Sequence, residues 1–376
     1  MELLFATLLF ISIYALQNYL YKKYWNKNID IEMHFSSHYA NVSDNLILYE
    51  KVVNNKILPL PSVTASFFVS KNLIFSDNNN SSISDNYYRH DIFSIMNYQQ
   101  VNRTIHFTPS KRGFYQIHDV KLKCTDLFLS KEYIVNCDCS DYLYVFPKKI
   151  VYKDFPIPLN SIIGNYLSTK FTNEDPFEFK SIREYQPFDN INSINWKSSA
   201  KTNKLMVNVH NPTSSLKVTI VLNLDGNNGF ETNSIFEKSI SIASSISQHL
   251  TKQNIPVSLY TNGIDILTNT CQDIDFGSGS NHQKNIDKSL ARIDLSMSCK
   301  NTNDKLNELI KKSSNNSMII LISNYRKDEL YNTFINENNK NNNITWILPY
   351  NKVQKIDNKI MQNKDILKWE VRDIEH

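Results

Sequence analysis

The sequence Leu-Lys-Val-Thr-Ile-Val-Leu-Asn-Leu-Asp at residues 216–225 is an almost unbroken run of apolar side chains. A strand that is buried on both faces of a parallel sheet has this composition. The period then changes, and apolar residues recur every three or four positions at Phe236, Ile240, Ala243, Ile246 and Leu250. This spacing lines one face of a helix, so residues 235–250 are predicted to be helical. A buried strand followed by an amphipathic helix indicates an α/β domain.

The rest of the C-terminal half repeats this alternation. Strands are predicted at 256–260, 317–323 and 344–349, and a helix at 306–311. Alternating strands and helices build a mostly parallel sheet with helices on both faces. Residues 215–376 are therefore predicted to form an α/β domain of the Rossmann type, whose usual ligand position is the carboxyl end of the strands.

Residues 29–150 show a different pattern of short, alternating segments rich in β-branched and aromatic residues. Turn clusters separate predicted strands at 29–35, 45–53, 62–69, 104–108, 119–124 and 142–146. Repeated short strands at this spacing are typical of an antiparallel β-sandwich. Together with the C-terminal domain, this predicts an α+β multidomain chain, which suits a length of 376 residues.

The N-terminus is apolar. Residues 3–21 contain no charged side chain, and a helix needs about 20 residues to cross a bilayer. Residues 1–25 are therefore predicted to be a transmembrane anchor, with a buried helix of a soluble domain as the alternative. A cleaved signal peptide is disfavoured, because no positive charge precedes the apolar run. Four aromatic residues are expected to form a belt at the membrane interface: Tyr19, Tyr21, Tyr24 and Trp25.

The positive charges that flank this helix predict its orientation. Lys22, Lys23 and Lys27 all follow the apolar run, which by the positive-inside rule places the rest of the chain in the cytoplasm. The five cysteines are scattered and odd in number, a pattern that suits a reducing compartment better than a disulfide framework. We therefore expect a single-pass protein of the cell membrane whose soluble part is cytoplasmic.

Composition disfavours several function classes. A formal net charge of +4 is small for a nucleic-acid-binding protein of this length. The seven glycines form neither a Walker A loop nor a complete dinucleotide fingerprint. Cys137 and Cys139 have no second Cys or His pair at a zinc-like spacing, and there is no nucleophile elbow. The sequence thus predicts a non-enzymatic protein without a cofactor.

The most distinctive stretch lies between the two predicted domains, in residues 151–214. It reads Asp-Pro-Phe-Glu-Phe-Lys-Ser-Ile-Arg-Glu-Tyr-Gln-Pro-Phe-Asp at 175–189, Ile-Asn-Trp-Lys-Ser-Ser-Ala-Lys at 194–201 and Leu-Met-Val at 205–207. This order resembles the signature of the bacterial family called domain of unknown function fifty-eight. Upstream segments at 111–115, 126–128 and 145–147 also look like that family.

The resemblance implies a membrane-bound protein with a von Willebrand A-like C-terminal domain and no enzymatic activity. Members of the family are often encoded beside MoxR-type AAA+ ATPases, so such an ATPase is the expected partner. The sequence departs from the family pattern at two positions. Phe188 stands where glycine is usual, and Asn192 stands where arginine is common.

The signature mixes charged and large aromatic residues at Arg183, Glu184, Tyr185, Asp189, Trp196 and Lys197. One interpretation is an internal clamp, in which Arg183 pairs with an acid and Trp196 packs beneath the pair. The other is a partner-binding surface, because Trp, Tyr and Arg are over-represented at interaction hot spots.

A von Willebrand A domain holds a divalent cation with an Asp-x-Ser-x-Ser sequence at the end of its first strand. Here that strand ends with Asp225, Asn227 stands at the second position, and Gly229 supplies no side-chain ligand. A later strand ends with Ser323 and Asn324, where an active site has aspartate. One carboxylate and one amide make a poor magnesium site, so a degenerate, metal-free site is expected.

These observations favour a membrane-anchored adaptor or scaffold that docks a cytoplasmic partner such as a MoxR-type ATPase. The alternative is an outward-facing envelope protein that binds peptide or a surface polymer.

Overall fold

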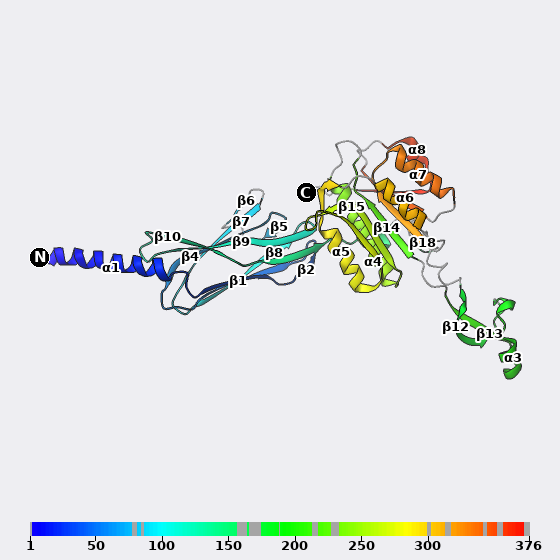
Figure 1. Cartoon of the computed structure of the whole chain (residues 1–376), viewed down its shortest axis with the longest axis horizontal. Coiled ribbons are helices and arrows are strands. Elements are labelled where there is room, and N and C mark those ends of the chain that lie inside the picture. Colours follow the sequence, from blue (N-terminus) through cyan, green and yellow to red (C-terminus); the bar gives the residue numbers. More distant parts are fainter. Residues whose placement is uncertain are drawn as a thin grey trace. The chain divides into compact units, whose positions relative to one another are not determined.

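The computed structural model describes residues 2–76, 81–83, 86–155, 164, 174–187, 189–212, 217–226, 233–298, 302–312, 317–340, 344–351 and 356–371 (Figure 1). The chain divides into two compact units, Met1–Lys148 and Lys149–His376. The first begins with an apolar helix and continues in strands, and the second alternates strands and helices. The predicted mixture of an N-terminal apolar helix, a β-rich region and an α/β region is therefore found.

The first unit contains helix α1 (Glu2–Tyr24) and two sheets. One sheet has the order β1-β3-β8-β5, with β1 (Ile29–Phe35), β3 (Leu46–Asn54), β8 (Gln100–Pro109) and β5 (Leu73–Phe75). The other has the order β2-β11-β9-β4-β7-β6, with β10 paired to β9. Its strands are β2 (Tyr39–Asn41), β11 (Asp141–Phe146), β9 (Gly113–Thr125), β4 (Leu60–Ser70), β7 (Asn86–Ile95), β6 (Ser81–Ile83) and β10 (Glu132–Cys137).

One core joins the two sheets. Leu48 and Phe107 from the first sheet and Phe67 and Leu122 from the second are buried in the same apolar cluster. Buried and exposed positions alternate along β3, as expected for a strand with one face in a core. The pairing is antiparallel except between β2 and β11, which run parallel. The described strands thus fit the predicted sandwich in its broad features.

The C-terminal turns of α1 pack against this sandwich. Tyr21 is fully buried, and its hydroxyl donates to the carbonyl oxygen of Pro59 at 2.6 Å. Trp25 is also buried and lies against Tyr133, with 5.8 Å between ring centroids. The predicted interface belt is therefore wrong for these two residues, because the sandwich core takes them up. Tyr19 and Tyr24 remain exposed.

The second unit is built on a sheet of order β16-β15-β14-β18-β19-β20, with β17 paired to β15. Its strands are β14 (Lys217–Asn223), β15 (Val257–Asp265), β16 (Cys271–Gly277), β17 (Ile293–Ser298), β18 (Ser317–Ser323), β19 (Ile344–Tyr350) and β20 (Ile366–Glu370). Five adjacent strands, β15, β14, β18, β19 and β20, are parallel to one another. Strands β16 and β17 are antiparallel to β15. The predicted strands at 216–225, 317–323 and 344–349 correspond to β14, β18 and β19.

Helices cover both faces of this sheet and produce two apolar cores. Residues of α4 (Asn233–Lys252) and α5 (Gly279–Ala291) pack with one set of strand residues that includes Ile220 and Ile320. Residues of α6 (Thr302–Lys312), α7 (Asp328–Asn338) and α8 (Asn358–Gln362) pack with the alternate set, which includes Val221 and Leu321. A strand with apolar residues at every position is needed to fill both cores.

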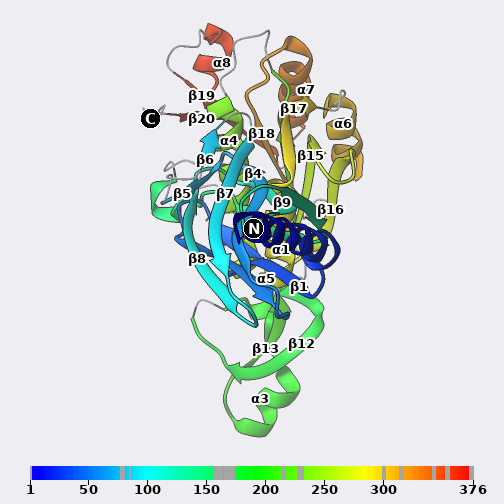
Figure 2. The same cartoon turned by 90° about the vertical axis from the view of Figure 1, so that its left-hand side faces the viewer.

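The signature segment also belongs to the second unit. It forms the antiparallel pair β12 (Glu174–Glu184) and β13 (Met206–Pro212), joined through η2 (Ile191–Ser193) and α3 (Trp196–Thr202) (Figure 2). We refer to residues 174–212 as the motif hairpin. A further short helix, η1 (Tyr152–Asp154), precedes it in the chain.

The cysteines depart from the expectation of uniformly reduced thiols. Cys124, Cys137 and Cys139 are free, whereas Cys271 is disulfide-bonded. Cys299 lies outside the described residues. Because disulfides persist mainly in oxidising compartments, the cysteines do not support the predicted cytoplasmic location in the way that the sequence suggested.

Candidate functional site

The motif hairpin is held in shape by local hydrogen bonds. The backbone nitrogen of Tyr185 donates to the carbonyl of Leu205 at 2.8 Å, which extends the strand pairing. Asn195 caps α3, since its side chain accepts from the backbone nitrogen of Ser198 at 2.9 Å. The same side chain donates to Asn208 on β13 at 2.8 Å. Asn195 therefore fastens the start of α3 to the neighbouring strand and fixes the position of Trp196, the first residue of the helix.

A two-point ion pair lies at the turn that follows β12. Both terminal nitrogens of Arg183 donate to the carboxylate oxygens of Asp189 at 2.6 Å. The carboxylate also accepts from the backbone nitrogen of Gln186 at 2.8 Å, and the guanidinium donates to the carbonyl of Glu184 at 3.1 Å. The hydrogen bonds from Arg183 lower the pKa of Asp189 below its usual value. The pair thus closes the turn with the planar geometry that arginine and carboxylate share.

The other charged residues of the signature are more exposed. Glu184 pairs with Lys204 at 2.6 Å, and the hydrogen bond that the Lys204 ammonium group donates to the Glu184 carboxylate raises the pKa of Lys204. Both side chains are more than half exposed, so the pair contributes little to stability. Lys197 is exposed and Tyr185 is half-buried. Phe188, which replaces the usual glycine, lies outside the described residues.

Trp196 is 66% exposed, so the expectation that it packs beneath the ion pair is wrong. Arg183 and Asp189 form the ion pair of the turn. Trp196 is one of several exposed large apolar residues of the motif hairpin, the others being Phe179, Ile182, Ile191 and Leu205. A two-stranded hairpin has too few layers to bury such residues by itself. The motif hairpin therefore presents apolar side chains together with fixed charges.

A second polar cluster lies at the carboxyl ends of the central strands of the second unit. Asn223 ends β14 and is aligned with Ser323 at the end of β18, and its side-chain nitrogen donates to the Ser323 hydroxyl at 3.2 Å. This is the point where the strand order reverses, because β15 follows on one side of β14 and β19 on the far side of β18. Ligands of open α/β sheets bind at such switch points.

Asp225 is the acid of this strand-end cluster. One of its oxygens accepts from the side-chain nitrogen of Asn262 at 2.8 Å, and the other accepts from the hydroxyl of Thr302 at 3.2 Å. Burial raises the pKa of Asp225, while the bonds from Thr302 and Asn262 act in the opposite direction. The hydroxyl of Thr302 also reaches the side-chain oxygen of Asn223 at 3.1 Å. Among the described residues, the cluster thus joins one carboxyl group to neutral hydrogen-bond partners.

These residues do not fit a divalent cation. Magnesium requires near-octahedral oxygen ligation with carboxylates, and the described cluster supplies only Asp225. The group that Asn262 directs at Asp225 is an N–H donor, which opposes a cation at the same place. Across the described residues, no group of three His, Cys, Asp or Glu side chains is placed to hold a metal ion. Asn227 and Gly229 lie outside those residues.

Sequence reasoning named Asp225, Ser323 and Asn324 but did not name Asn223, Asn262 or Thr302. Asn223 gave a signal, because it is the one amide in a buried strand that is mostly apolar. Asn262 and Thr302 come from 37 and 77 residues further along the chain, and no local pattern marks them. Asn324 is buried directly after β18.

Residues 181–347 match the model of a family described as "Protein of unknown function DUF58". This match supports the family resemblance that the signature indicated, and it includes most of the motif hairpin and the strand-end cluster. No curated protein matches the chain.

Three of the solved structures that are similar to part of the chain have low sequence identity to it. The CARDB domain of the PF1109 protein from Pyrococcus furiosus is 14% identical with a TM-score of 0.22, covering 32% of this chain and 90% of that domain. A non-cellulosomal cohesin from Archaeoglobus fulgidus is 11% identical with a TM-score of 0.22, covering 31% and 91%. The PapD-like domain 7 of human CEP192 is 10% identical with a TM-score of 0.22, covering 32% and 87%. At these TM-scores the likenesses carry no conclusion.

Proposed function

We propose that this chain is a single-pass, membrane-anchored adaptor without enzymatic activity, which docks a protein partner through the motif hairpin. The partner that the family resemblance favours is a MoxR-type AAA+ ATPase. The observation that carries the proposal is the exposure of Trp196 on a helix start that Asn195 holds in place, in the same hairpin as the ion pair of Arg183 and Asp189. An exposed tryptophan on a rigid support loses little conformational entropy on binding, which is why such residues dominate interfaces.

The α/β domain is proposed to be von Willebrand A-like. The support is its sheet order, in which one antiparallel edge strand, β16, adjoins five parallel strands with helices on both faces. In such a fold the strand-end cluster would correspond to the cation site, with Asp225 two residues after the end of β14. Because Asp225 is engaged by Asn262 and Thr302, we propose that this site stabilises the domain and binds no metal.

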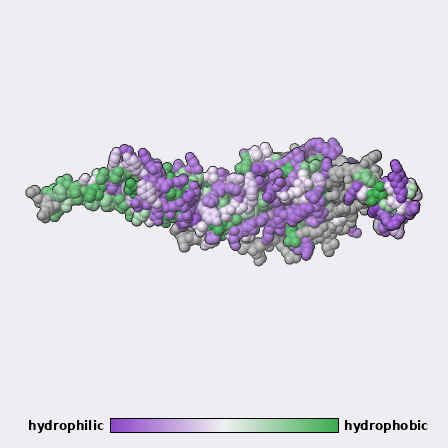
Figure 3. All heavy atoms as spheres, turned by 90° about the horizontal axis from the view of Figure 1, so that it is seen from below, coloured by the Kyte–Doolittle hydropathy of each residue, from purple (hydrophilic) through white to green (hydrophobic). Residues whose placement is uncertain are grey.

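Membrane anchoring is supported by α1, in which residues 3–24 are long and apolar enough to cross a bilayer. Figure 3 shows hydrophobic side chains covering this helix. Residues 3–9 of this helix are exposed on all sides, and lipid would provide an apolar surrounding for them.

The docking proposal is tested by measuring the affinity of the full chain in lipid nanodiscs for a purified MoxR-type ATPase from the same organism. Trp196→Ala should weaken binding at least tenfold, because truncating a hot-spot tryptophan costs about 2 kcal/mol or more. Phe276→Ala is the matched control, since Phe276 is an exposed aromatic of the same unit and lies outside the motif hairpin. Equal affinities for both variants and the unmodified chain would refute the proposed surface.

One observation favours the alternative of an outward-facing envelope protein. The disulfide at Cys271 suits an oxidising compartment, which is outside the cytoplasm. Orientation is tested by introducing Asn102→Cys on the exposed face of β8 and labelling intact cells with a membrane-impermeant maleimide. Labelling only after permeabilisation supports the cytoplasmic adaptor, whereas labelling of intact cells supports the alternative.

A further inference from the structure

The connection between β9 and β10 presents three consecutive apolar side chains to the outside of the sandwich. Leu127, Phe128 and Leu129 are 50%, 46% and 66% exposed. We call residues 126–131 the tip loop. An exposed apolar run of this kind at the end of a hairpin is costly in water and marks an interaction surface.

The tip loop is rigid, because the buried Asp126 organises it. The Asp126 carboxylate accepts from the backbone nitrogen of Ser130 and from the Ser130 hydroxyl, both at 2.6 Å. The backbone nitrogen of Leu129 donates to the carbonyl of Asp126 at 3.0 Å. Leu129 has a φ of 56°, a left-handed conformation that is unfavourable for leucine. The loop therefore holds a strained backbone with Leu129 pointing outward, and such strain is associated with functional positions.

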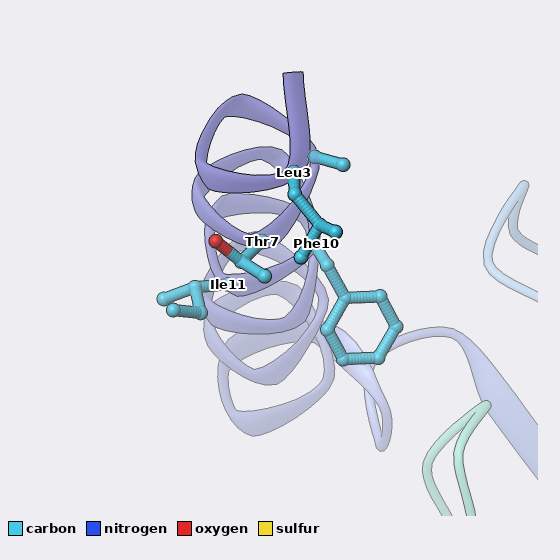
Figure 4. A pocket seen from close by; sticks show the side chains of 5 residues that line it. Leu3, Thr7, Phe10 and Ile11 are labelled. Carbon is cyan, nitrogen blue, oxygen red and sulfur yellow. The ribbon is translucent and has the colours of Figure 1, made fainter. Parts of the chain in front are cut away.

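The tip loop is also fixed against α1. Phe128 lies between Phe10 and Tyr14, with ring centroids 5.9 Å from each. The hydroxyl of Tyr14 donates to Ser130 at 3.2 Å, and the side-chain nitrogen of Gln17 donates to the Asp126 carboxylate at 3.1 Å. Phe10, Tyr14 and Gln17 follow one another at helical spacing, so they form a single stripe. Figure 4 shows the Phe10 ring projecting sideways from the helix.

These contacts place the tip loop at a defined level along α1. Residues 3–13 are exposed on all sides of the helix and extend about 16 Å at 1.5 Å per residue. The hydrocarbon core of a bilayer is about 30 Å thick, so residues 3–13 alone do not fill it. With residues 3–13 in the hydrocarbon core, the tip loop lies at the boundary between the core and the lipid headgroups. With the whole apolar run of α1 in the core, Phe128 lies within the core.

We propose that Leu127, Phe128 and Leu129 insert into the lipid bilayer beside α1, so that the helix and the tip loop form one membrane-binding surface. The proposal rests on the proposed membrane anchoring of α1. The occupant is lipid because the apolar surface of the loop is continuous with that of the helix through Phe10 and Phe128. Lys131, the last residue of the loop, is a cation suited to the phosphate level of the bilayer.

The test attaches a fluorophore to single cysteines in the full chain, reconstituted in phosphatidylcholine nanodiscs with and without doxyl-labelled lipid. Leu129→Cys reports on the tip loop, Leu9→Cys on α1, and Tyr98→Cys on an equally exposed loop of the same unit. Cys137 and Cys139 are replaced by Ser because they are the partly exposed free thiols of the described residues, whereas Cys124 is buried and Cys271 is disulfide-bonded. Thermal melting confirms that each variant is folded, and Leu127→Cys serves as a second reporter.

We expect doxyl lipid to quench position 129 at least half as strongly as position 9 and several times more strongly than position 98. Quenching at 9 without quenching at 129 would overturn the insertion of the loop and leave the anchor intact. Absence of quenching at 9 would overturn the anchor itself. If 129 is shielded from aqueous iodide but is not quenched by lipid, protein covers the loop and the proposal is wrong.

Discussion

The ammonium group of Lys149 lies 2.6 Å from the carboxylate of Asp287, and the two side chains are only 22% and 6% exposed. Lys149 is the first residue of the second unit, and Asp287 lies on α5. Ser244 on α4 also donates to this carboxylate at 2.6 Å, and so does Gln283 at 3.0 Å. The start of the second unit is thus tied to two helices that pack on the same face of the sheet.

Removing one partner of this pair should destabilise the second unit. Asp287→Ala leaves the Lys149 charge buried without a counter-ion, which typically costs about 3–5 kcal/mol. Thermal or denaturant unfolding of the full chain measures the change. As the control, Lys312→Ala removes the exposed pair with Glu308 and should leave the transition where it is. Equal effects of the two changes would contradict the assigned role of the buried pair.

The stability of the first unit should increase at high pH, because Lys56 then loses its buried positive charge. Burial lowers the pKa of Lys56 to about 8, and among the described residues its ammonium group has no hydrogen-bond partner. Below pH 8 lysine is charged in both states and the folded protein bears the cost of burying the charge. Between about 8 and 10.5 only the unfolded state keeps the proton, so stability rises with pH.

Replacing Lys56 with Met removes this charge and should raise the melting temperature most at pH 7. The gain corresponds to about 1–3 kcal/mol for relieving an unsatisfied buried polar group. The difference between the variant and the unmodified chain should shrink as the pH approaches 10. A difference that stays constant over this pH range would show that Lys56 does not titrate as described.

The turn of the motif hairpin should depend on the two-point geometry of Arg183 and Asp189. Arg183→Lys keeps the charge but cannot form two parallel hydrogen bonds with a carboxylate. We expect faster amide hydrogen exchange in residues 185–194, measured by mass spectrometry. Lys204→Met removes the exposed pair with Glu184 and is the matched control, with exchange expected to be unchanged. Identical exchange in both variants would mean that the pair does not order the turn.

The same ion pair gives a pH dependence of known sign. Because the pKa of Asp189 is lowered in the folded state, the turn should stay ordered above the usual aspartate pKa. It should loosen as the pH falls through the lowered value. Hydrogen exchange followed at decreasing pH checks this, with Arg183→Lys expected to loosen at a higher pH than the unmodified chain.

Asp225 should be dispensable for partner binding. Asp225→Asn removes a carboxyl group whose pKa is raised by burial, so a neutral amide avoids the cost of the charged form at pH 7. We expect equal or slightly higher stability and no effect of a chelator on binding. Calorimetry with magnesium and manganese should detect no micromolar site. Micromolar binding that Asp225→Asn abolishes would establish a working metal site.

The parts of the fold that depend on sequence period were predictable. The apolar run at 216–225 contains β14 (Lys217–Asn223), whose alternate residues point into different cores, and an almost continuous apolar composition indicates a strand of this kind. The antiparallel direction of β16 and β17 was not predictable, since strand direction follows from which element each strand meets in space. The sheet is therefore mixed at one edge.

The candidate sites show the same limit. Trp196 lies in a sequence of mixed charges and aromatics that is compatible with both a clamp and a surface, and its exposure distinguishes the two. Tyr21 and Trp25 resemble interface residues because they follow an apolar run, but the sandwich buries them. Thr302 lies 77 residues after Asp225 in the sequence, and the tertiary fold brings the two side chains together. The hydrophobic period of a sequence indicates local secondary structure, whereas the burial and the neighbours of these side chains depend on contacts between distant segments.

The attachment of α1 to the sandwich has a mechanical consequence. Tyr21 and Gln17 bind the helix directly to Pro59 and Asp126, so no flexible linker separates the apolar helix from the first sheet unit. A membrane helix changes its tilt when the thickness of the bilayer changes. Because these contacts fix α1 to the sandwich, a change in the tilt of the helix would rotate the sandwich by the same angle. The orientation of the sandwich relative to the membrane would therefore depend on bilayer thickness, and so on lipid composition.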